Sequence, residues 1–179
     1  MADETDGSNG DAPQGAGGDG ESAAAQPQFS IQAQYVKDLS FENPRAPHSL
    51  RQNEQPKIEL TVTVNGQHLG NDNHEVNLEM TAKAMQGDDV AFVAELTYGG
   101  VFHVSGFPDE QTRPVVVIEC PRMLFPFARR VLADCTRDGG FPPLMLEPID
   151  FVALYRQSEQ ARQQAEAGTP NGGANGNGA

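Results

Sequence analysis

Four histidines, and a serine close to one of them, are the first residues in this sequence whose types could support catalysis or metal binding. Ser105 lies two positions after His103, but no strand-to-helix turn of the kind that exposes a nucleophilic serine surrounds this pair. His68 and His74 are expected in a polar, glycine-rich loop, which would not preorganise metal ligands. The runs GDDV and NDN are typical of turns and do not predict paired catalytic carboxylates.

The cysteines and the common sequence motifs give no further support for catalysis. Cys120 and Cys135 are fifteen positions apart, which is neither a CxxC pair nor a disulfide framework, so we expect two partly buried free thiols. None of GxxxxGK[ST], GxSxG and HExxH occurs, and the GxGxxG pattern occurs only as GAGGDG at residues 15–20, in the glycine-rich N-terminal tail. We therefore expect a protein that is not an enzyme, with no catalytic residue, no metal site and no cofactor.

The charge balance restricts the possible partners. The formal net charge is −13 and the pI is about 4.5, and the 12 Lys and Arg residues form no cluster. This argues against nucleic acid and anionic membranes as partners, and favours basic partners such as unfolded chains rich in Lys and Arg. The N-terminus does not resemble a secretory signal, and no apolar stretch approaches the roughly 20 residues that span a bilayer. We expect a cytoplasmic protein without membrane insertion.

Carboxylates recur on one side of a predicted strand at residues 29–42. Side chains of like parity share one face of a strand. The apolar set, which we expect to face a core, is Phe29, Ile31, Ala33, Tyr35, Leu39 and Phe41. The polar set is Ser30, Gln32, Gln34, Asp38, Ser40 and Glu42. At a rise of roughly 3.3 Å per residue, Asp38 and Glu42 would lie about 13 Å apart on the polar face.

Three further segments show the same alternation, at residues 57–65, 74–85 and 90–100. The segments ENPRAP, NGQHLGNDN and QGDD separate the four strands and are rich in turn-forming residues. Strands with one polar face each indicate an antiparallel sheet that is covered on one side only.

Helices are expected after the strands. The segment TRPVVVIECPRMLFPFARRVLADCTRD has a helical stripe of Met123, Leu124, Phe127, Val131 and Leu132, although PVVVIE alone could form a strand. Pro121 and Pro126 predict a kink or a segmented helix, and Gly139-Gly140 predict a helix end. After an apolar linker stiffened by prolines, Asp150 is expected to cap a second helix, with Phe151, Leu154 and Tyr155 on one face. Strands followed by helices make an α+β domain.

The domain should occupy residues 29–166. Residues 1–28 and 167–179 are rich in Gly, Ala, Asn and Asp and lack the apolar side chains that offset ordering entropy, so we expect both tails to be disordered. The helices and the linker are more apolar than a domain of this size needs for its own core. We expect the excess to form subunit contacts or a groove for apolar partners.

Several segments in this order resemble the SecB family of protein-export chaperones: KDLSFENPRAPH, YGGVF, CPRMLFPFARRVLAD and GGFPPLMLEPIDFVALY. The likeness covers roughly residues 29–157. Glu54 stands where the family often has a tryptophan. The resemblance implies an ATP-independent cytosolic holdase that assembles as a dimer-of-dimers homotetramer. It would bind unfolded precursor proteins, keep them competent for translocation and deliver them to the SecA motor of the secretion machinery.

The resemblance also implies two sites. The zinc-bearing, basic C-terminal tail of the SecA motor would dock on an acidic sheet surface, which maps onto Asp38, Glu42, Val93 and Glu95. The client-binding groove would be lined by Phe41, Phe141, Leu144, Leu146, Ile149 and Phe151. The residues alone leave two alternatives open: an oligomeric acidic adaptor that binds folded partners without holdase activity, and a small enzyme with an unrecognised site.

Overall fold

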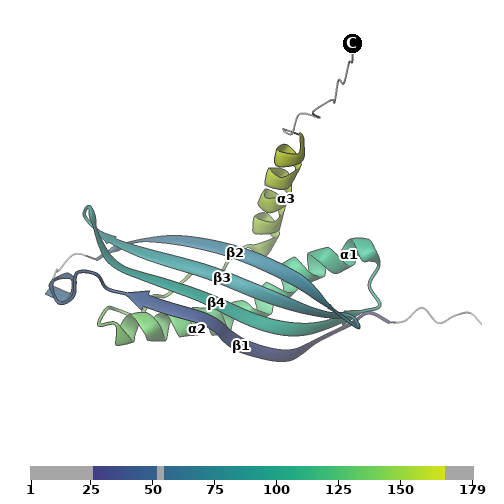
Figure 1. Ribbon diagram of the computed structural model, residues 1–179, viewed down its shortest axis with the longest axis horizontal. Helices are drawn as coiled ribbons and strands as arrows, with labels where there is room; N and C mark the ends of the chain where they lie inside the picture. Colours follow the sequence, from purple (N-terminus) through teal and green to yellow (C-terminus); the bar gives the residue numbers. More distant parts are fainter. Residues whose placement is uncertain (1–25, 52–54, 168–179) are drawn as a thin grey trace, which may run out of the picture.

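A computed structural model describes residues 26–51 and 55–167 of the protein. Four antiparallel strands form one sheet in the order β1-β4-β3-β2 (Figure 1). Their bounds are Gln28–Glu42, Lys57–Gly70, Asn73–Gln86 and Asp89–Ser105 for β1 to β4. Three helical segments, α1, η2 and α2, then run without a break, and α3 follows after a linker. The predicted α+β fold with a four-stranded antiparallel sheet is confirmed. Most of both predicted tails, and Glu54, lie outside the described residues.

The alternation in β1 is interrupted twice, so the predicted single apolar face is wrong. The pairing of β1 with β4 skips Gln32 and Lys37, and each extra residue forms a β-bulge that reverses the parity of the strand. Phe29, Ile31, Leu39 and Phe41 therefore share the helix-covered side, as expected. Ala33 and Tyr35 pair with Val101 and Gly99 and lie on the other side, together with Asp38, Ser40 and Glu42.

Strands β2 and β3 form a tighter hairpin than the sequence suggests. The turn is only Asn71-Asp72, and both residues have positive φ (50° and 59°), as a two-residue type I′ turn requires. The expected loop around His68 and His74 is also wrong: His68 lies in β2 and His74 in β3, and the two residues are register partners.

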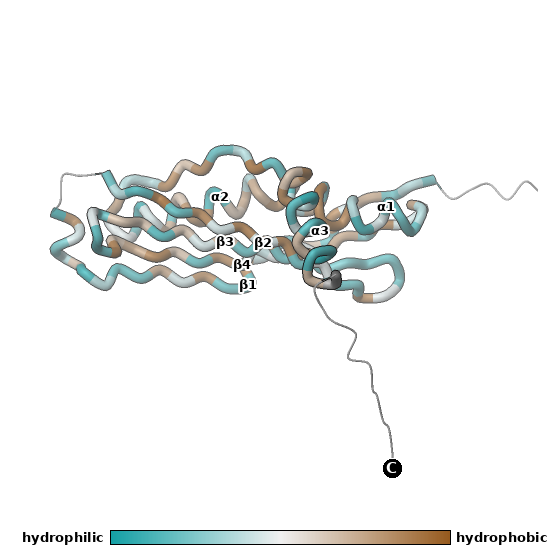
Figure 2. Tube along the Cα trace, turned by 90° about the horizontal axis from the view of Figure 1, so that it is seen from above, coloured by the Kyte–Doolittle hydropathy of each residue, from teal (hydrophilic) through white to brown (hydrophobic). Residues whose placement is uncertain are grey.

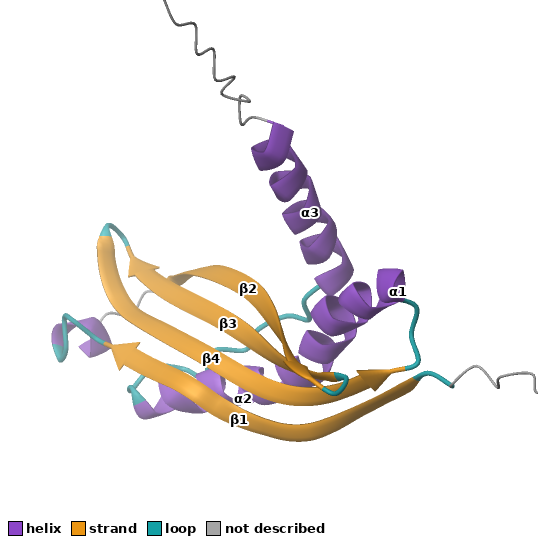
Figure 3. Ribbon diagram, turned by 45° about the vertical axis from the view of Figure 1, so that its right-hand side comes forward, coloured by secondary structure: helices purple, strands orange, loops and turns teal. Residues whose placement is uncertain are grey.

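One side of the sheet is covered by the long helical segment, and α3 (Phe151–Ala167) projects away from it (Figures 1 and 3). The segment consists of α1 (Asp109–Pro114), a π-helical turn η2 (Val115–Glu119) and α2 (Cys120–Asp138). PVVVIE is therefore helical. The predicted segmentation is present at Pro121, which lies in the first turn of α2 directly after the π-turn. At Pro126 the helix is not divided, because α2 continues through this residue to Asp138.

The buried face of α2 differs from the predicted stripe. It is formed by Cys120, Leu124, Ala128, Leu132 and Thr136, which follow one another at four-residue steps and are all fully buried. Met123 and Phe127, expected in the stripe, are 40% and 46% exposed.

Both predicted helix ends are confirmed. Helix α2 ends at Asp138, and Gly140 then adopts φ +86° while the N–H of Phe141 bonds to the carbonyl of Thr136, which closes the helix end. Asp150 caps α3, since its Oδ1 accepts hydrogen bonds from the N–H groups of Val152 and Ala153, both at 3.0 Å.

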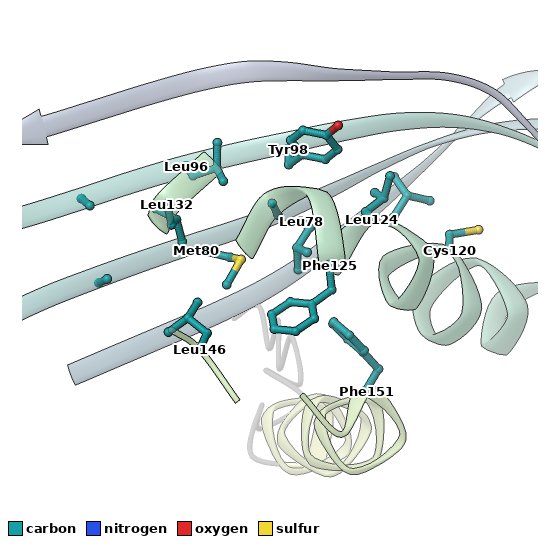
Figure 4. Close-up of a cluster of buried hydrophobic side chains, with 14 of the residues drawn as sticks. Leu78, Met80, Leu96, Tyr98, Cys120, Leu124, Phe125, Leu132, Leu146 and Phe151 are labelled. Carbon is teal, nitrogen blue, oxygen red and sulfur yellow. The ribbon is translucent and has the colours of Figure 1, made fainter. Parts of the chain in front are cut away.

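The core lies between the sheet and α2 (Figure 4). Even-numbered side chains of β3 and β4 form its floor, and α2, the linker and the start of α3 form its roof. Hydrophilic and hydrophobic positions alternate along the strands (Figure 2), because only one face of the sheet is covered. The opposite face is left open.

Candidate binding surfaces on the two faces of the sheet

The open face of the sheet carries an acidic patch, which we define as Asp38, Glu42, Glu79 and Glu95. The register brings these side chains together: Asp38 lies opposite Thr97, which lies opposite Glu79 on β3, and Ser40 lies opposite Glu95. Glu42 lies opposite Val93. All four residues predicted to bind the SecA motor, Asp38, Glu42, Val93 and Glu95, therefore share this face beside the β1 edge.

A shallow cavity of about 240 Å³ lies within the acidic patch, between Asp38, Glu79, Thr81, Glu95 and Thr97. The hydroxyl of Ser40 donates a hydrogen bond of 3.3 Å to Glu95, and the side-chain amide of Asn65 donates one of 2.8 Å to Glu79. Asp38 and Glu42 are exposed. Carboxylates with this spacing and exposure can attract a cationic segment by Coulomb interaction and by charge-assisted hydrogen bonds.

Glu79 was missed by sequence reasoning, although its parity in β3 placed it on the polar side. Only the register shows that it joins Asp38, because β4 lies between the two strands. Lys83 of β3 lies opposite Val93, beside the patch.

A cluster of three side chains holds β1 at its second bulge. The hydroxyl of Tyr35 and the ammonium of Lys37 both donate hydrogen bonds to Glu75 of β3, the latter at 2.8 Å. These bonds, that of Lys37 first, lower the pKa of Glu75. Burial and then the Glu75 carboxylate raise the pKa of Tyr35 to about 12. The cluster fixes the strand where its parity changes, one residue before Asp38.

On the covered side, aromatic rings join β1, β4 and the linker. The ring of Phe92 stacks on that of Phe41 at 5.5 Å and packs against that of Phe141 at 4.8 Å. Phe141 also lines an apolar cavity of about 220 Å³, together with Ile58, Pro142, Leu144 and Met145 among others. A second, open cavity of about 450 Å³ lies on the other side of Phe41, beside Leu39, Val131 and Cys135.

The linker is held in place by Thr136, a fully buried polar residue of α2. Its hydroxyl donates to the carbonyl of Leu132 at 3.0 Å and accepts a hydrogen bond of 2.9 Å from the N–H of Leu144. Leu144 is thereby fixed at the wall of the apolar cavity. Its neighbour Met145 is 64% exposed, the most exposed large apolar side chain of the described residues.

The six predicted groove residues divide into two groups. Phe41, Phe141 and Leu144 line the two cavities described above. Leu146 and Phe151 belong to the core, 7% and 1% exposed, with the Phe151 ring 6.1 Å from that of Phe125 (Figure 4). Ile149 is half-buried against the core. Ile58, Phe92 and Met145 were missed, although Met145 stands in the same apolar linker as Leu144.

The described residues show no arrangement for nucleophilic chemistry. Burial, and to a lesser extent Glu119, raises the pKa of the Cys120 thiol to about 12, and burial also raises the pKa of Cys135. Neither thiol is therefore activated. No group of three or more His, Cys, Asp and Glu side chains in the described chain has a metal-binding arrangement.

The described helices are all too short or too polar to cross a membrane.

Comparison with known proteins identifies the family. Residues 22–162 match the family described as preprotein translocase subunit SecB. A protein-export protein SecB from Mesorhizobium japonicum is 52% identical over 159 residues, which cover 88% of this chain and 95% of that protein. One from Maricaulis maris is 52% identical over 160 residues, with 88% and 91% covered.

A solved structure shares the fold. It is a SecB-like chaperone from Mycobacterium tuberculosis in complex with a peptide from an antitoxin, with a TM-score of 0.54 and 17% identity over 68% of this chain and 90% of that one. Together with the acidic patch and the apolar cavities, the family match leads to one conclusion. The chain belongs to the SecB family of protein-export chaperones, which are not enzymes.

Proposed function

We propose that the protein is an ATP-independent holdase of the cytoplasm, which binds unfolded precursor proteins, keeps them competent for translocation and delivers them to the SecA motor. One observation carries this proposal: the two faces of the sheet present surfaces of opposite character. The open face bears the acidic patch, and the covered side bears apolar cavities around Phe41, Phe141 and Leu144. A carrier that holds a client and docks on a motor at the same time needs two such separate surfaces.

The apolar cavities suit a binder of many unrelated sequences. The walls of the cavity beside Phe141 combine the flexible side chain of Met145, the stiff rings of Pro142 and Pro143, and the aromatic ring of Phe141. Each client Leu or Phe that is buried there contributes roughly 1.5–3 kcal/mol at best, before ordering costs are subtracted. Affinity would then come from several modest contacts along an extended client.

The acidic patch suits the basic, zinc-bearing tail of the motor. Asp38 and Glu42 flank Ser40 on β1, and on β4 Glu95 lies opposite Ser40 and Val93 lies opposite Glu42. The carboxylates supply the attraction, and Val93 supplies a small apolar contact between them. Because the exposed carboxylates are screened by salt, docking should weaken as ionic strength rises.

Self-assembly into a dimer of dimers would cover the apolar side chains that a single chain leaves exposed. Val36 and Leu39 of β1 are 45% and 43% exposed, and Met123 and Phe127 of α2 are 40% and 46% exposed. Helix α2 packs mainly on β4 and β3, which leaves the helix side of β1 partly open. Exposed apolar side chains concentrated on two neighbouring elements are typical of subunit interfaces.

The experiment that tests this proposal combines two measurements on the purified full chain. Light scattering of a slow-folding, denatured client after dilution should stay low in the presence of the protein without nucleotide. Native mass spectrometry should show four chains. A tetramer that leaves client aggregation unchanged would favour the alternative of an acidic adaptor for folded partners.

A further inference from the structure

Two histidines form a pair on the covered side of the sheet, away from the acidic patch and the apolar cavities. His68 of β2 and His74 of β3 are direct register partners next to the Asn71-Asp72 turn. Their rings are 4.9 Å apart between centroids and inclined at 66°. Since both residues belong to paired strands, the hairpin backbone preorganises them.

The spacing of the two rings suits a shared metal ion. At a metal–nitrogen distance of about 2.0–2.1 Å, two imidazole ligands of a tetrahedral ion have their nitrogens about 3.3 Å apart. The nitrogens lie at the ring edges, so rings whose centroids are about 5 Å apart reach this separation by side-chain rotation alone. We propose that His68 and His74 form a two-imidazole site for a divalent transition-metal ion of the Zn²⁺, Ni²⁺ and Cu²⁺ class. Imidazole is a suitable ligand for each of these ions.

The surroundings provide access and a favourable field. Both histidines line a cavity of about 660 Å³ that also has Asp72 and Asp109 in its wall. Arg113 lines it as well, but its guanidinium pairs with Glu159 at 2.9 Å. The cavity has room for the waters that must complete the coordination, because no third protein ligand is in place among the described residues.

The lowered pKa of His74 favours metal binding. A metal ligand must be a neutral imidazole. Burial, and then the adjacent His68, lowers the pKa of His74, while Asp72 opposes this shift. An ion held by both side chains would join β2 to β3 at the end of the hairpin. This inference does not depend on the holdase proposal, since the site lies on other residues.

The test uses the full chain without an affinity tag. Calorimetric titration with Ni²⁺ near neutral pH is compared for the unchanged protein, His68→Ala and His74→Ala. His103→Ala is the matched control: His103 pairs with Asn73, next to His74 in β3, but lies on the open face of the sheet. His48→Ala is a second control.

The unchanged protein and both control variants should bind one ion per chain. His68→Ala and His74→Ala should each bind at least about 10–100-fold more weakly, because this is the loss typical of changes at residues that only hydrogen-bond to a metal ligand. Equal affinity in all variants, or an equal loss in His103→Ala, would overturn the site. If a variant does not fold, the unchanged protein alone provides the test. Paramagnetic Cu²⁺ should then broaden the NMR signals of the His68 and His74 rings before those of the other histidines. First broadening of the His48 or His103 signals would refute the proposal.

Discussion

Tyr35 of β1 reaches across the intervening strand β4 and donates a hydrogen bond to Glu75 of β3. Gly99 of β4 makes this possible, because a Cβ atom at that position would lie 2.6 Å from the ring of Tyr35. Lys37, the extra residue of the bulge, donates a hydrogen bond to the same carboxylate. The side chain of Asp38, directly after the bulge, is thereby directed to the open face.

The first prediction concerns the ionisation of Tyr35. Its folded-state pKa is raised from 10.0 to about 12, so the folded protein holds the phenolic proton more tightly than the unfolded chain. The resulting stabilisation is complete below about pH 10 and is lost as the pH rises toward 12. Phenolate absorbance should show a tyrosine titrating near 12 that is absent from Tyr35→Phe and shifts downward in Glu75→Gln. If the titration that disappears in Tyr35→Phe has its midpoint near pH 10 instead, the hydrogen bond from Tyr35 to Glu75 does not exist in solution.

The second prediction concerns the apolar cavity that we propose as a client-binding site. Leu144→Ser combined with Met145→Ser should reduce the suppression of client aggregation, because both side chains are apolar and Met145 is 64% exposed. The proposed tetramer should persist. Leu69→Ser is the control, since Leu69 is 51% exposed at the β2–β3 hairpin, far from this cavity along the strand. Equal holdase activity in the double variant and in Leu69→Ser would place client binding elsewhere.

Leu146 is unsuitable for that test, although the sequence suggests it. It is 7% exposed within the core, so Leu146→Ser would bury a polar group and damage the fold. A loss of activity after this change would not distinguish a binding role from a packing role.

The third prediction concerns Thr136, which fixes the start of the linker. Thr136→Val keeps the shape of the side chain but leaves the N–H of Leu144 without its acceptor. The free energy of unfolding should fall by about 1–3 kcal/mol. Hydrogen exchange at the Leu144 amide should accelerate relative to Thr136→Ser, which retains the hydroxyl. An exchange rate that is the same in both variants would show that another group accepts this bond.

The sequence predicts the fold well because its signals are local. Alternating strands, the Gly139-Gly140 helix end and the Asp150 cap each depend on neighbouring residues, and all are present. The errors are equally local in cause. One extra residue in β1 at Gln32, and one at Lys37, reverses the strand faces without any distinctive sequence signal.

The site could be predicted only in part, because its composition depends on register and packing. Parity alone placed Asp38 with Glu42, and Val93 with Glu95. Glu79 could be assigned to the acidic patch only from the strand order, since β4 separates β3 from β1. Met145 is exposed beside the buried Leu146 because of the way the linker lies on α2. The hydrogen bond from the N–H of Leu144 to the hydroxyl of Thr136 holds the linker in this position.

The acidic patch and the apolar cavities that we propose for client binding lie on separate faces of the sheet. Asp38→Lys combined with Glu42→Lys turns attraction for a basic tail into like-charge repulsion on the open face, while the apolar cavities on the other side stay intact. Asp88→Lys combined with Glu110→Lys is the matched control, because it makes the same change in net charge at two exposed positions outside the patch.

The decisive measurement is a paired titration of each variant with the isolated C-terminal tail of the SecA motor and with an unfolded client, at low and high salt. We expect the Asp38/Glu42 variant to lose the tail and to keep the client, and the control to keep both. Tail binding at unchanged strength would contradict docking on the acidic patch. Loss of the client together with the tail would contradict the separation of the two surfaces.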